Sequence, residues 1–234
     1  MTQTLSLERQ LQIEINRPFL SKGEYVYELL KDKIVNGYLE RNKIYTIVEI
    51  AEDLGISRTP VSEAVKILGS QKYIILYQGV GFKVKELSSA DIRENLTISG
   101  ALEKAVLTKI LEDGTGTTEK LELAVAKSWE AVKNQMPNLY TQSSAEFHKA
   151  FYALAALPRV AEILRENVFV HEAWYRAGAN RYPDAINRLI EDHEDIIKVI
   201  SSRKKNLIDD VINTHVENCE YVLLKVIQDE GSKG

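Results

Sequence analysis

Histidine is the residue type in this sequence with the clearest capacity for chemistry, and all four histidines lie in its second half. Three of them, His148, His193 and His215, fall on apolar stripes of three different expected helices. A buried imidazole needs a partner, and three imidazoles that converge can bind one divalent metal such as zinc. Spacing alone favours the alternative, in which each is a hydrogen-bonded histidine of the core or of a pocket wall.

Few other residues offer chemistry. Cys219 is the single cysteine, which excludes an intramolecular disulfide, and its place on an apolar helical face predicts a buried, inert thiol. The sequence has no paired His-Glu motif on one helix, no nucleophile beside a base and no glycine-rich phosphate loop. We therefore predict that the protein is not an enzyme, with a metalloenzyme built on a helical bundle as an alternative.

The segments that carry the histidines predict an all-α antiparallel bundle. Apolar residues recur there at helical spacing, and short segments with Gly or Pro separate the helices. Ser88 or Ser89 is expected to cap the first helix. The expected helices span residues 89–112, 117–135, 139–155, 157–176, 182–202 and 205–229.

A second set of residues, in the first half, has the pattern of a helix-turn-helix. A short apolar helix over 47–54 is broken at Gly55, and an amphipathic helix follows, with Pro60 in its first turn and Ser57 as its expected N-cap. Its expected buried stripe is Val61, Ala64, Val65 and Leu68. Facing outward at its N-terminal end, where base edges and phosphates are met, are Ser57, Arg58, Thr59 and Ser62.

The residues after this helix predict a β-hairpin wing. Residues 71–76 are rich in β-forming side chains, residues 78–81 form a turn, and residues 82–85 alternate with period two. A helix-turn-helix followed by a hairpin is a winged helix, in which Gly81 and Lys83 are further candidates for DNA contact. We expect an N-terminal arm over 1–20, a winged helix-turn-helix domain over 21–87 and an all-helical domain over 88–234.

The helix-turn-helix resembles the signature of the GntR family of transcriptional regulators. Residues 54–65 read Leu-Gly-Ile-Ser-Arg-Thr-Pro-Val-Ser-Glu-Ala-Val, and the similarity is specific over residues 23–85. Three positions depart from the family: Ser62 and Val80 stand where basic residues are usual, and Arg41-Asn42 replaces a Pro-Gly pair. Because each bidentate base contact contributes about 1–3 kcal/mol, we expect weaker or differently specific DNA binding.

The helical half resembles the FadR-type effector domain, the FCD class. Phe147-His148, His193 with Ile196, and His215 match its histidine motifs. The resemblance implies a divalent metal, zinc, nickel or manganese, held by His148, His193 and His215, and an effector pocket for a carboxylate. The expected pocket residues are Ser144, Ser99 and Glu103.

Two of these pocket residues depart from the family. Ser144 replaces its aspartate ligand, and Ser99 replaces an arginine four residues before Glu103. With serine at 144, three outcomes stay open: weaker metal binding, recruitment of water or Glu146 as a ligand, or an anionic ligand held without metal.

The charge is unevenly distributed. The net charge is −4, yet residues 21–87 hold 10 Lys/Arg and 9 Asp/Glu, whereas residues 88–234 hold 18 Lys/Arg and 23 Asp/Glu. We therefore expect modest, salt-dependent DNA affinity. No signal peptide opens the chain, and no apolar run approaches the roughly 18–20 residues that span a bilayer, so we expect a cytoplasmic protein without a membrane partner.

These patterns together predict a transcriptional regulator, with repression the commoner outcome in the family. It would bind a palindromic operator in double-stranded DNA as a homodimer, and a small metabolite, possibly a carboxylate, would control its affinity. The alternative is a regulator whose effector pocket has degenerated, as Ser144 and Ser99 suggest, and which responds to a protein partner.

Overall fold

The computed structural model describes residues 21–35, 38–40, 43–86, 88–114, 116–164, 178–179 and 181–231. The chain divides into two compact units, Met1–Glu86 and Leu87–Gly234, and each has buried apolar residues of its own. The expected arm over 1–20 lies outside the described residues, as do His171 and residues 165–177 of the expected helix 157–176.

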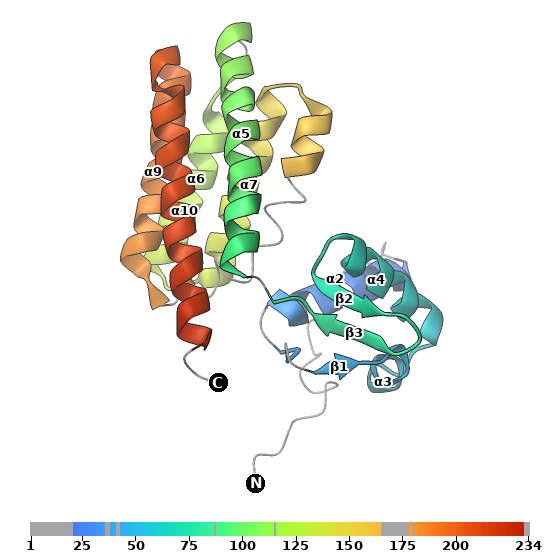
Figure 1. Ribbon diagram of the computed structural model, residues 1–234. Coiled ribbons are helices and arrows are strands. Elements are labelled where there is room, and N and C mark those ends of the chain that lie inside the picture. Colours follow the sequence, from blue (N-terminus) through green and yellow to red (C-terminus); the bar gives the residue numbers. More distant parts are fainter. Residues whose placement is uncertain are drawn as a thin grey trace. The chain divides into compact units, whose positions relative to one another are not determined.

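Three helices form the core of the first unit (Figure 1). Helices α2 (Lys22–Val35) and α3 (Ile47–Asp53) both pack against α4 (Arg58–Ser70). Thr46 begins α3 with a capping box: its hydroxyl accepts the Glu49 N–H at 3.1 Å, and the Glu49 carboxylate accepts the Thr46 N–H at 2.8 Å. Gly55, at φ +62°, allows the turn into α4, which confirms the predicted helix-turn-helix.

Helix α4 is positioned by the predicted stripe of Val61, Ala64, Val65 and Leu68, which is buried. Ser57 stands at the N-cap, as predicted, with an extended backbone, but its side chain makes no capping hydrogen bond. Pro60, the third residue of the helix, lacks one of the two N–H groups that an N-cap hydroxyl can accept. The Ser57 hydroxyl is therefore left exposed.

The wing is part of a three-stranded antiparallel sheet. Strands β2 (Ile74–Tyr77) and β3 (Gly81–Val84) form the expected hairpin, and β1 (Ile44–Tyr45), which the sequence did not predict, pairs with the other edge of β3. The resulting order is β1-β3-β2. Phe82 is fully buried and stacks on Tyr45 at 5.8 Å between ring centroids, which ties the hairpin to β1.

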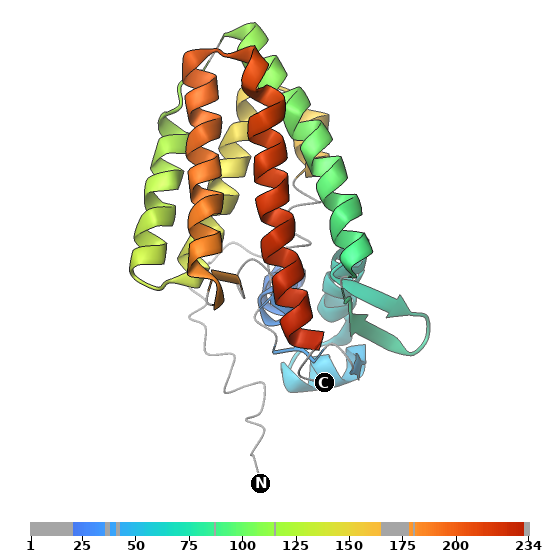
Figure 2. The ribbon, with the colours of Figure 1, turned by 60° about the vertical axis from the view of Figure 1, so that its left-hand side comes forward.

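The second unit is the predicted all-α bundle. Helix α6 packs against α7, and α10 lies along both α5 and α9 (Figures 1 and 2). Residues 158–164 are also helical. The long helices are α5 (Ser89–Asp113), α6 (Glu119–Lys133), α7 (Pro137–Leu154), α9 (Pro183–Ser202) and α10 (Ile208–Gly231), the last entered through the 3₁₀ turn η1 (Lys205–Leu207).

Local residues set the ends of these helices. Ser88 caps α5 through a capping box with Asp91, and Gly114 ends it at φ +62°. Pro137 begins α7 two residues before the expected start at 139, because a proline at the first helical position needs no N–H partner. No helix in the described ranges is long and apolar enough to cross a membrane.

The glycine at the start of β3 generates a prediction about the stability of the first unit. A Cβ on Gly81 would lie 2.2 Å from the carbonyl oxygen of Tyr45, so we expect Gly81→Ala to force β1 from β3 and destabilise this unit by about 2–3 kcal/mol. Gly79 is the matched control: its φ is +74° but its Cβ would meet nothing within 4 Å, so alanine there should cost only about 1 kcal/mol. Hydrogen exchange of the amides of residues 44–84 measures both, and equal losses would contradict the role given to Gly81.

Candidate functional site

The residues predicted to contact DNA gather at one end of α4 and in the wing. Ser57, Arg58 and Thr59 are exposed, and Ser62 is half-buried about one turn further along the helix. The opposite side of α4 is buried by the apolar stripe, so this end is presented outward with its unpaired backbone N–H groups. Such an end favours phosphate oxygens, and Arg58 adds a permanent positive charge.

The wing itself is more apolar than basic. Lys83, half-buried, lies between Ile44 of β1 and Ile75 of β2 in the register of the sheet. Gly81, also predicted to contact DNA, has a structural role because its missing side chain allows β1 to pair with β3. The exposed apolar side chains of the hairpin are Ile75, Leu76, Tyr77 and Val80. Because the tip residue Val80 is uncharged, the positive charges of this strand come from Lys83 within β3 and Lys85 directly after it.

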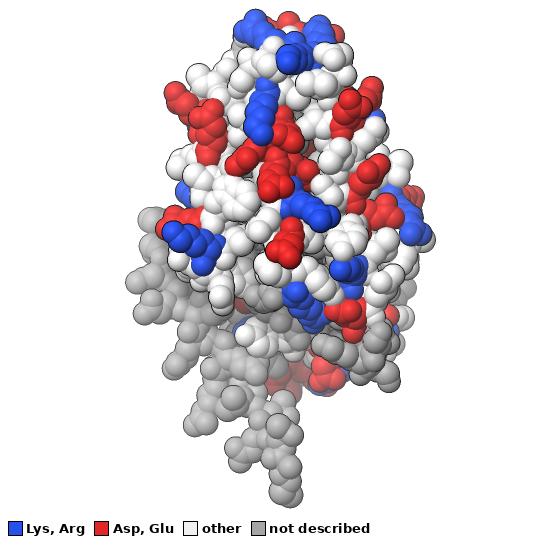
Figure 3. Space-filling model, turned by 90° about the vertical axis from the view of Figure 1, so that its left-hand side faces the viewer, with Lys and Arg blue, Asp and Glu red and all other residues white. Residues whose placement is uncertain are grey.

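The helical unit does not share this character. On the face in Figure 3, basic and acidic side chains of the bundle alternate rather than gather by sign. Together with the net −5 of residues 88–234, this makes the face a poor partner for a phosphate backbone.

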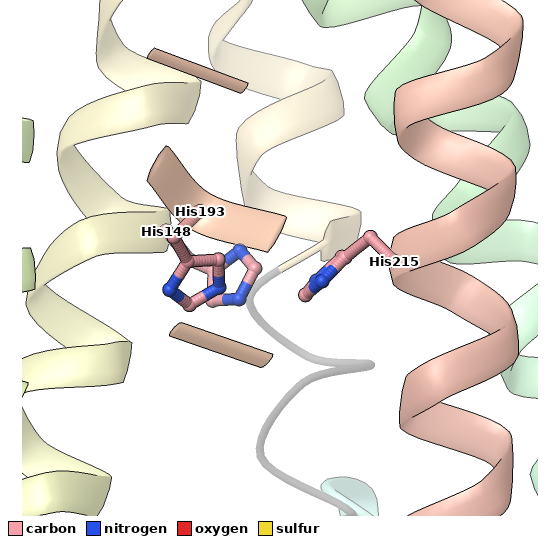
Figure 4. Close-up of side chains that lie close together, drawn as sticks. All are labelled: His148, His193 and His215. Atoms are coloured by element: carbon pink, nitrogen blue, oxygen red, sulfur yellow. The ribbon is translucent and has the colours of Figure 1, made fainter. Parts of the chain in front are cut away.

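The structure brings His148, His193 and His215 together in the core of the bundle (Figure 4). They come from α7, α9 and α10, and their potential ligand atoms all lie within 4.8 Å of one another. The ring centroids are 4.9 Å apart for His148 and His193, 5.0 Å for His193 and His215, and 5.6 Å for His148 and His215. All three are buried.

Apolar packing holds the rings in place. Phe147, fully buried, stacks on the His193 ring at 3.9 Å between centroids and 11° between planes. His193 itself lies on the stripe of α9 with Ile186, Leu189 and Ile196, all of which are buried. The helical spacing that buries these apolar residues thus also directs His193 into the bundle.

Two carboxylates lie beside the histidines. Glu103 of α5 accepts a hydrogen bond from the Tyr152 hydroxyl at 2.7 Å and lies 3.6 Å from Nδ1 of His148. Asp192 accepts from the Asn218 amide at 3.0 Å on each oxygen and lies 3.5 Å from Nδ1 of His215. A carboxylate beside Nδ1 is common behind metal-binding histidines, but here neither carboxylate is hydrogen-bonded to its ring: Nδ1 of His148 lies 3.2 Å from the Tyr152 hydroxyl, and Nδ1 of His215 has no hydrogen-bond partner among the described residues.

Burial and nearby ionisable groups set the pKa values of this cluster. It lowers the pKa of His148 to about 3, and it lowers the pKa of His193 well below its usual range, with nearby His148 and His215 adding to the effect. Burial also acts to lower the pKa of His215, but Cys219, Asp192 and Glu103 outweigh it and raise the value. Burial raises the pKa of the Glu103 carboxyl. His148 and His193 are therefore neutral, the form in which imidazole binds metals.

The donor set fits a divalent metal. Both ring nitrogens of His193 are buried and have no hydrogen-bond partner among the described residues. An unpaired buried polar atom costs about 1–3 kcal/mol, which a bound cation would remove. Zinc–nitrogen bonds of about 2.0–2.1 Å set ligand nitrogens about 3.4 Å apart in a tetrahedral site, so the rings would have to draw slightly closer.

The other predicted pocket residues lie at different distances from the histidines. Glu103 is in the cluster, and Ser99 is half-buried one turn before it on α5. Ser144 is half-buried one turn before His148. Glu146, one of the possible replacement ligands, is paired with Lys127 of α6 at 2.8 Å and does not join the cluster.

Sequence reasoning missed the residues that surround the triad. Tyr152, Asp192, Asn218 and Cys219 all contact one of its members or a carboxylate behind it. Two of them carry a signal that could have found them: Tyr152 follows His148, and Cys219 follows His215, by four residues, which places each pair on one helical face.

The neutral, unpaired state of His193 predicts how stability depends on pH. In metal-free protein His193→Leu should be at least as stable as the wild type, because leucine leaves no unpaired polar atom beside Phe147. Below the unfolded pKa of about 6.5 only the unfolded wild type gains the His193 proton, so the advantage of the variant should grow by up to about 1.4 kcal/mol per pH unit.

Urea unfolding at about pH 8 and about pH 5.5 measures this difference. Tryptophan fluorescence is the probe, because both tryptophans, Trp129 and Trp174, belong to the helical unit. An advantage that shrinks as the pH falls would mean that His193 is charged in the folded protein.

Comparison with known proteins places both units. Residues 22–84 match the bacterial regulatory proteins of the gntR family, and residues 94–218 match the FCD domain. Among solved structures, a putative transcriptional regulator GntR from Rhodococcus sp. RHA1 has a TM-score of 0.72 at 19% identity, over 88% of this chain and 99% of that one. E. coli McbR/YncC has a TM-score of 0.65 at 20% identity, over 92% and 97% of the two chains.

Two bacterial regulators are similar to this chain in sequence. The gluconate operon transcriptional repressor of Bacillus licheniformis is 23% identical over 80% of this chain and 79% of its own length. The Uxu operon regulator of Haemophilus influenzae is 24% identical over 94% of this chain and 87% of its own length. With a gntR-type winged helix followed by an FCD domain, the chain belongs to the GntR family of bacterial transcriptional regulators, in its FadR-type subfamily.

Proposed function

We propose that this regulator is a homodimeric repressor whose affinity for a palindromic operator is controlled by a carboxylate metabolite bound at a metal in the helical domain. The observation that carries the proposal is the buried convergence of His148, His193 and His215 in a chain that also holds a winged helix. One unit supplies DNA recognition and the other a polar site inside an otherwise apolar core.

The DNA side of the proposal rests on α4. Ser57, Arg58 and Thr59 are exposed at the helix end that enters the major groove in helix-turn-helix proteins. Two copies related by a twofold axis would place two such ends about one helical turn of DNA apart, which calls for a palindromic operator. Ser62 and Val80 contribute no charge, so specificity depends strongly on Arg58.

The effector side rests on the triad and the groups behind it. His148, His193 and His215 would hold zinc, nickel or manganese, and the carboxylates of Glu103 and Asp192 would orient two of the three rings. When bound, the metal supplies a positive charge and a free coordination position for a carboxylate oxygen. One relative is the repressor of a gluconate operon, and gluconate is a hydroxy carboxylate, which agrees with an effector of this class.

A regulator with a degenerate pocket is the second candidate, and Ser144 is the observation in its favour. A serine hydroxyl is uncharged and cannot supply the negative charge of the family aspartate. In that case a protein partner would take the place of the metabolite. The two candidates differ in whether metal binds and whether a small carboxylate changes operator affinity.

Substitution of Arg58 tests the DNA-binding assignment. We expect Arg58→Ala to lose specific operator binding, by at least about tenfold, because one bidentate base contact contributes about 1–3 kcal/mol. Lys66→Ala is the matched control, since Lys66 is also exposed on α4 but lies two turns from its N-terminal end. Fluorescence anisotropy at fixed salt, with a duplex selected by the wild type from a random library, measures both. Equal effects of the two substitutions would remove the recognition role from Arg58.

Elemental analysis tests the metal site. Untagged protein purified without chelator should contain about one zinc, nickel or manganese per chain, and His148→Ala should lose it, because two histidines rarely hold such a metal alone. His193→Ala should lower the thermal stability of metal-loaded protein more than that of metal-free protein. Protein without metal even after reloading, or equal losses of stability in both forms, would favour the degenerate pocket.

A further inference from the structure

We propose that Tyr152 is a positioning residue of the triad: its hydroxyl, held by Glu103, keeps the hydrogen of the His148 ring on Nδ1 and so leaves Nε2 as the nitrogen that can bind a metal. This inference rests on the proposed metal site and specifies which nitrogen of His148 takes part in it. It also gives a role to a buried tyrosine that the sequence motifs did not single out.

Tyr152 lies where α5 and α7 meet. It follows His148 by four residues, so both side chains lie on one face of α7, with ring centroids 5.7 Å apart. Glu103 reaches the same point from α5. Only 2% of Tyr152 and 3% of Glu103 is exposed. Polar groups so deeply buried have to satisfy one another, and the three side chains therefore form one hydrogen-bonded chain.

Two distances decide where the hydroxyl hydrogen of Tyr152 lies. A phenol has one hydrogen to donate, and its oxygen can also accept. This oxygen lies 2.7 Å from Oε1 of Glu103 and 3.2 Å from Nδ1 of His148. Hydroxyl donors make bonds of about 2.5–3.0 Å, and a bond to a carboxylate is roughly twice as strong as one between neutral groups. The hydroxyl hydrogen is therefore directed to Glu103.

The direction of that bond fixes the hydrogen of the neighbouring ring. With its own hydrogen donated to Glu103, the Tyr152 oxygen can only accept from Nδ1 of His148, and 3.2 Å is within the range of an N–H donor. Burial keeps His148 neutral, and a neutral imidazole carries one ring hydrogen. That hydrogen therefore sits on Nδ1, and Nε2 retains the lone pair that metal binding needs.

The opposite arrangement is well defined and can be told apart. If Glu103 donated to Tyr152, the hydroxyl would turn to Nδ1 of His148, and the ring hydrogen would move to Nε2, where it blocks metal binding. A divalent cation at the triad favours the carboxylate form of Glu103, and with it the chain that leaves Nε2 free.

Nitrogen-15 NMR of histidine-labelled, metal-free protein tests the inference without a metal. Protonated and unprotonated ring nitrogens of a neutral imidazole have different chemical shifts, and at about pH 8 histidines near their usual pKa are neutral. We expect a protonated Nδ1 and an unprotonated Nε2 for His148. Its signals are assigned by their absence from the spectrum of His148→Ala.

Three variants separate hydrogen bonding from packing. Glu103→Leu removes the acceptor, so the Tyr152 hydroxyl should turn to Nδ1 of His148 and the ring hydrogen should move to Nε2. Tyr152→Phe keeps the ring but removes the chain, and should give a mixture of both forms. Tyr140→Phe is the matched control, because Tyr140 is also buried on α7 but lies about 18 Å along the helix from Tyr152. It should leave the hydrogen on Nδ1.

Zinc affinity, measured by competition with a chromophoric chelator, connects the ring hydrogen to the metal site. We expect Glu103→Leu and Tyr152→Phe to bind zinc about 10–100-fold more weakly than the wild type, the usual effect of losing a group behind a metal-binding histidine. Tyr140→Phe should bind as the wild type does. Far-ultraviolet circular dichroism establishes that each variant is folded.

The two measurements distinguish this inference from the proposal on which it rests. A ring hydrogen on Nε2 in the wild type, or the same form in the wild type and Glu103→Leu, would overturn the role of Tyr152 and leave the three-histidine site standing. A wild type that has the hydrogen on Nδ1 yet binds no zinc would support the placement of the hydrogen and overturn the metal site.

Discussion

Burial of His193 against Phe147, with both imidazole nitrogens unpaired among the described residues, is the constraint around which the candidate site of the helical domain is built. An apolar ring in its place would pack as well and leave nothing unsatisfied, so the fold alone does not require histidine there. The same stripe of α9 that fills the core also delivers this imidazole to the rings of α7 and α10. The stability of the metal-free core and the proposed metal binding therefore place opposite demands on this one position.

The groups around the triad join four helices through one small cluster. Helix α5 contributes Glu103, α7 contributes His148, α9 contributes both His193 and Asp192, and α10 contributes His215. Helix α5 also begins at Ser89, only a few residues after β3 ends at Val84. A change in the cluster that shifts Glu103 therefore acts on the helix that follows the wing in the chain. Coupling of this kind needs a ligand that prefers one arrangement, which the proposed metal-bound carboxylate would supply.

Local patterns predicted most of the fold, and long-range contacts account for what they missed. Gly55 and the apolar stripe of α4 are signals confined to a few residues, and they located the helix-turn-helix correctly. Strand β1 has two residues, too few for alternation to show, and it exists because Gly81 of a distant strand has no side chain to exclude it. Ser57 is the N-cap that its residue type predicted, but Pro60 removes one of the two N–H groups that its hydroxyl could accept.

For the candidate site as well, local patterns predicted some features and long-range packing determined the others. Helical stripes placed the three histidines inward on separate helices, but no single-helix pattern could show that they meet. Asp192 precedes His193 in sequence yet lies beside His215, because neighbours on a helix point about 100° apart. The partner of each carboxylate is therefore fixed by how the helices pack.

Ser144 is weak support for a degenerate pocket once the whole cluster is considered. Buried polar groups that have lost their function can be replaced by apolar side chains at no loss of stability, and often with a gain. Here three imidazoles lie buried in one cluster, and hydrogen bonds from Tyr152 and Asn218 hold two buried carboxylates beside it. A site that had lost its ligand would retain no reason for this set. Serine at position 144 therefore removes one anionic group but leaves three neutral or neutralisable imidazoles that together still fit a divalent metal.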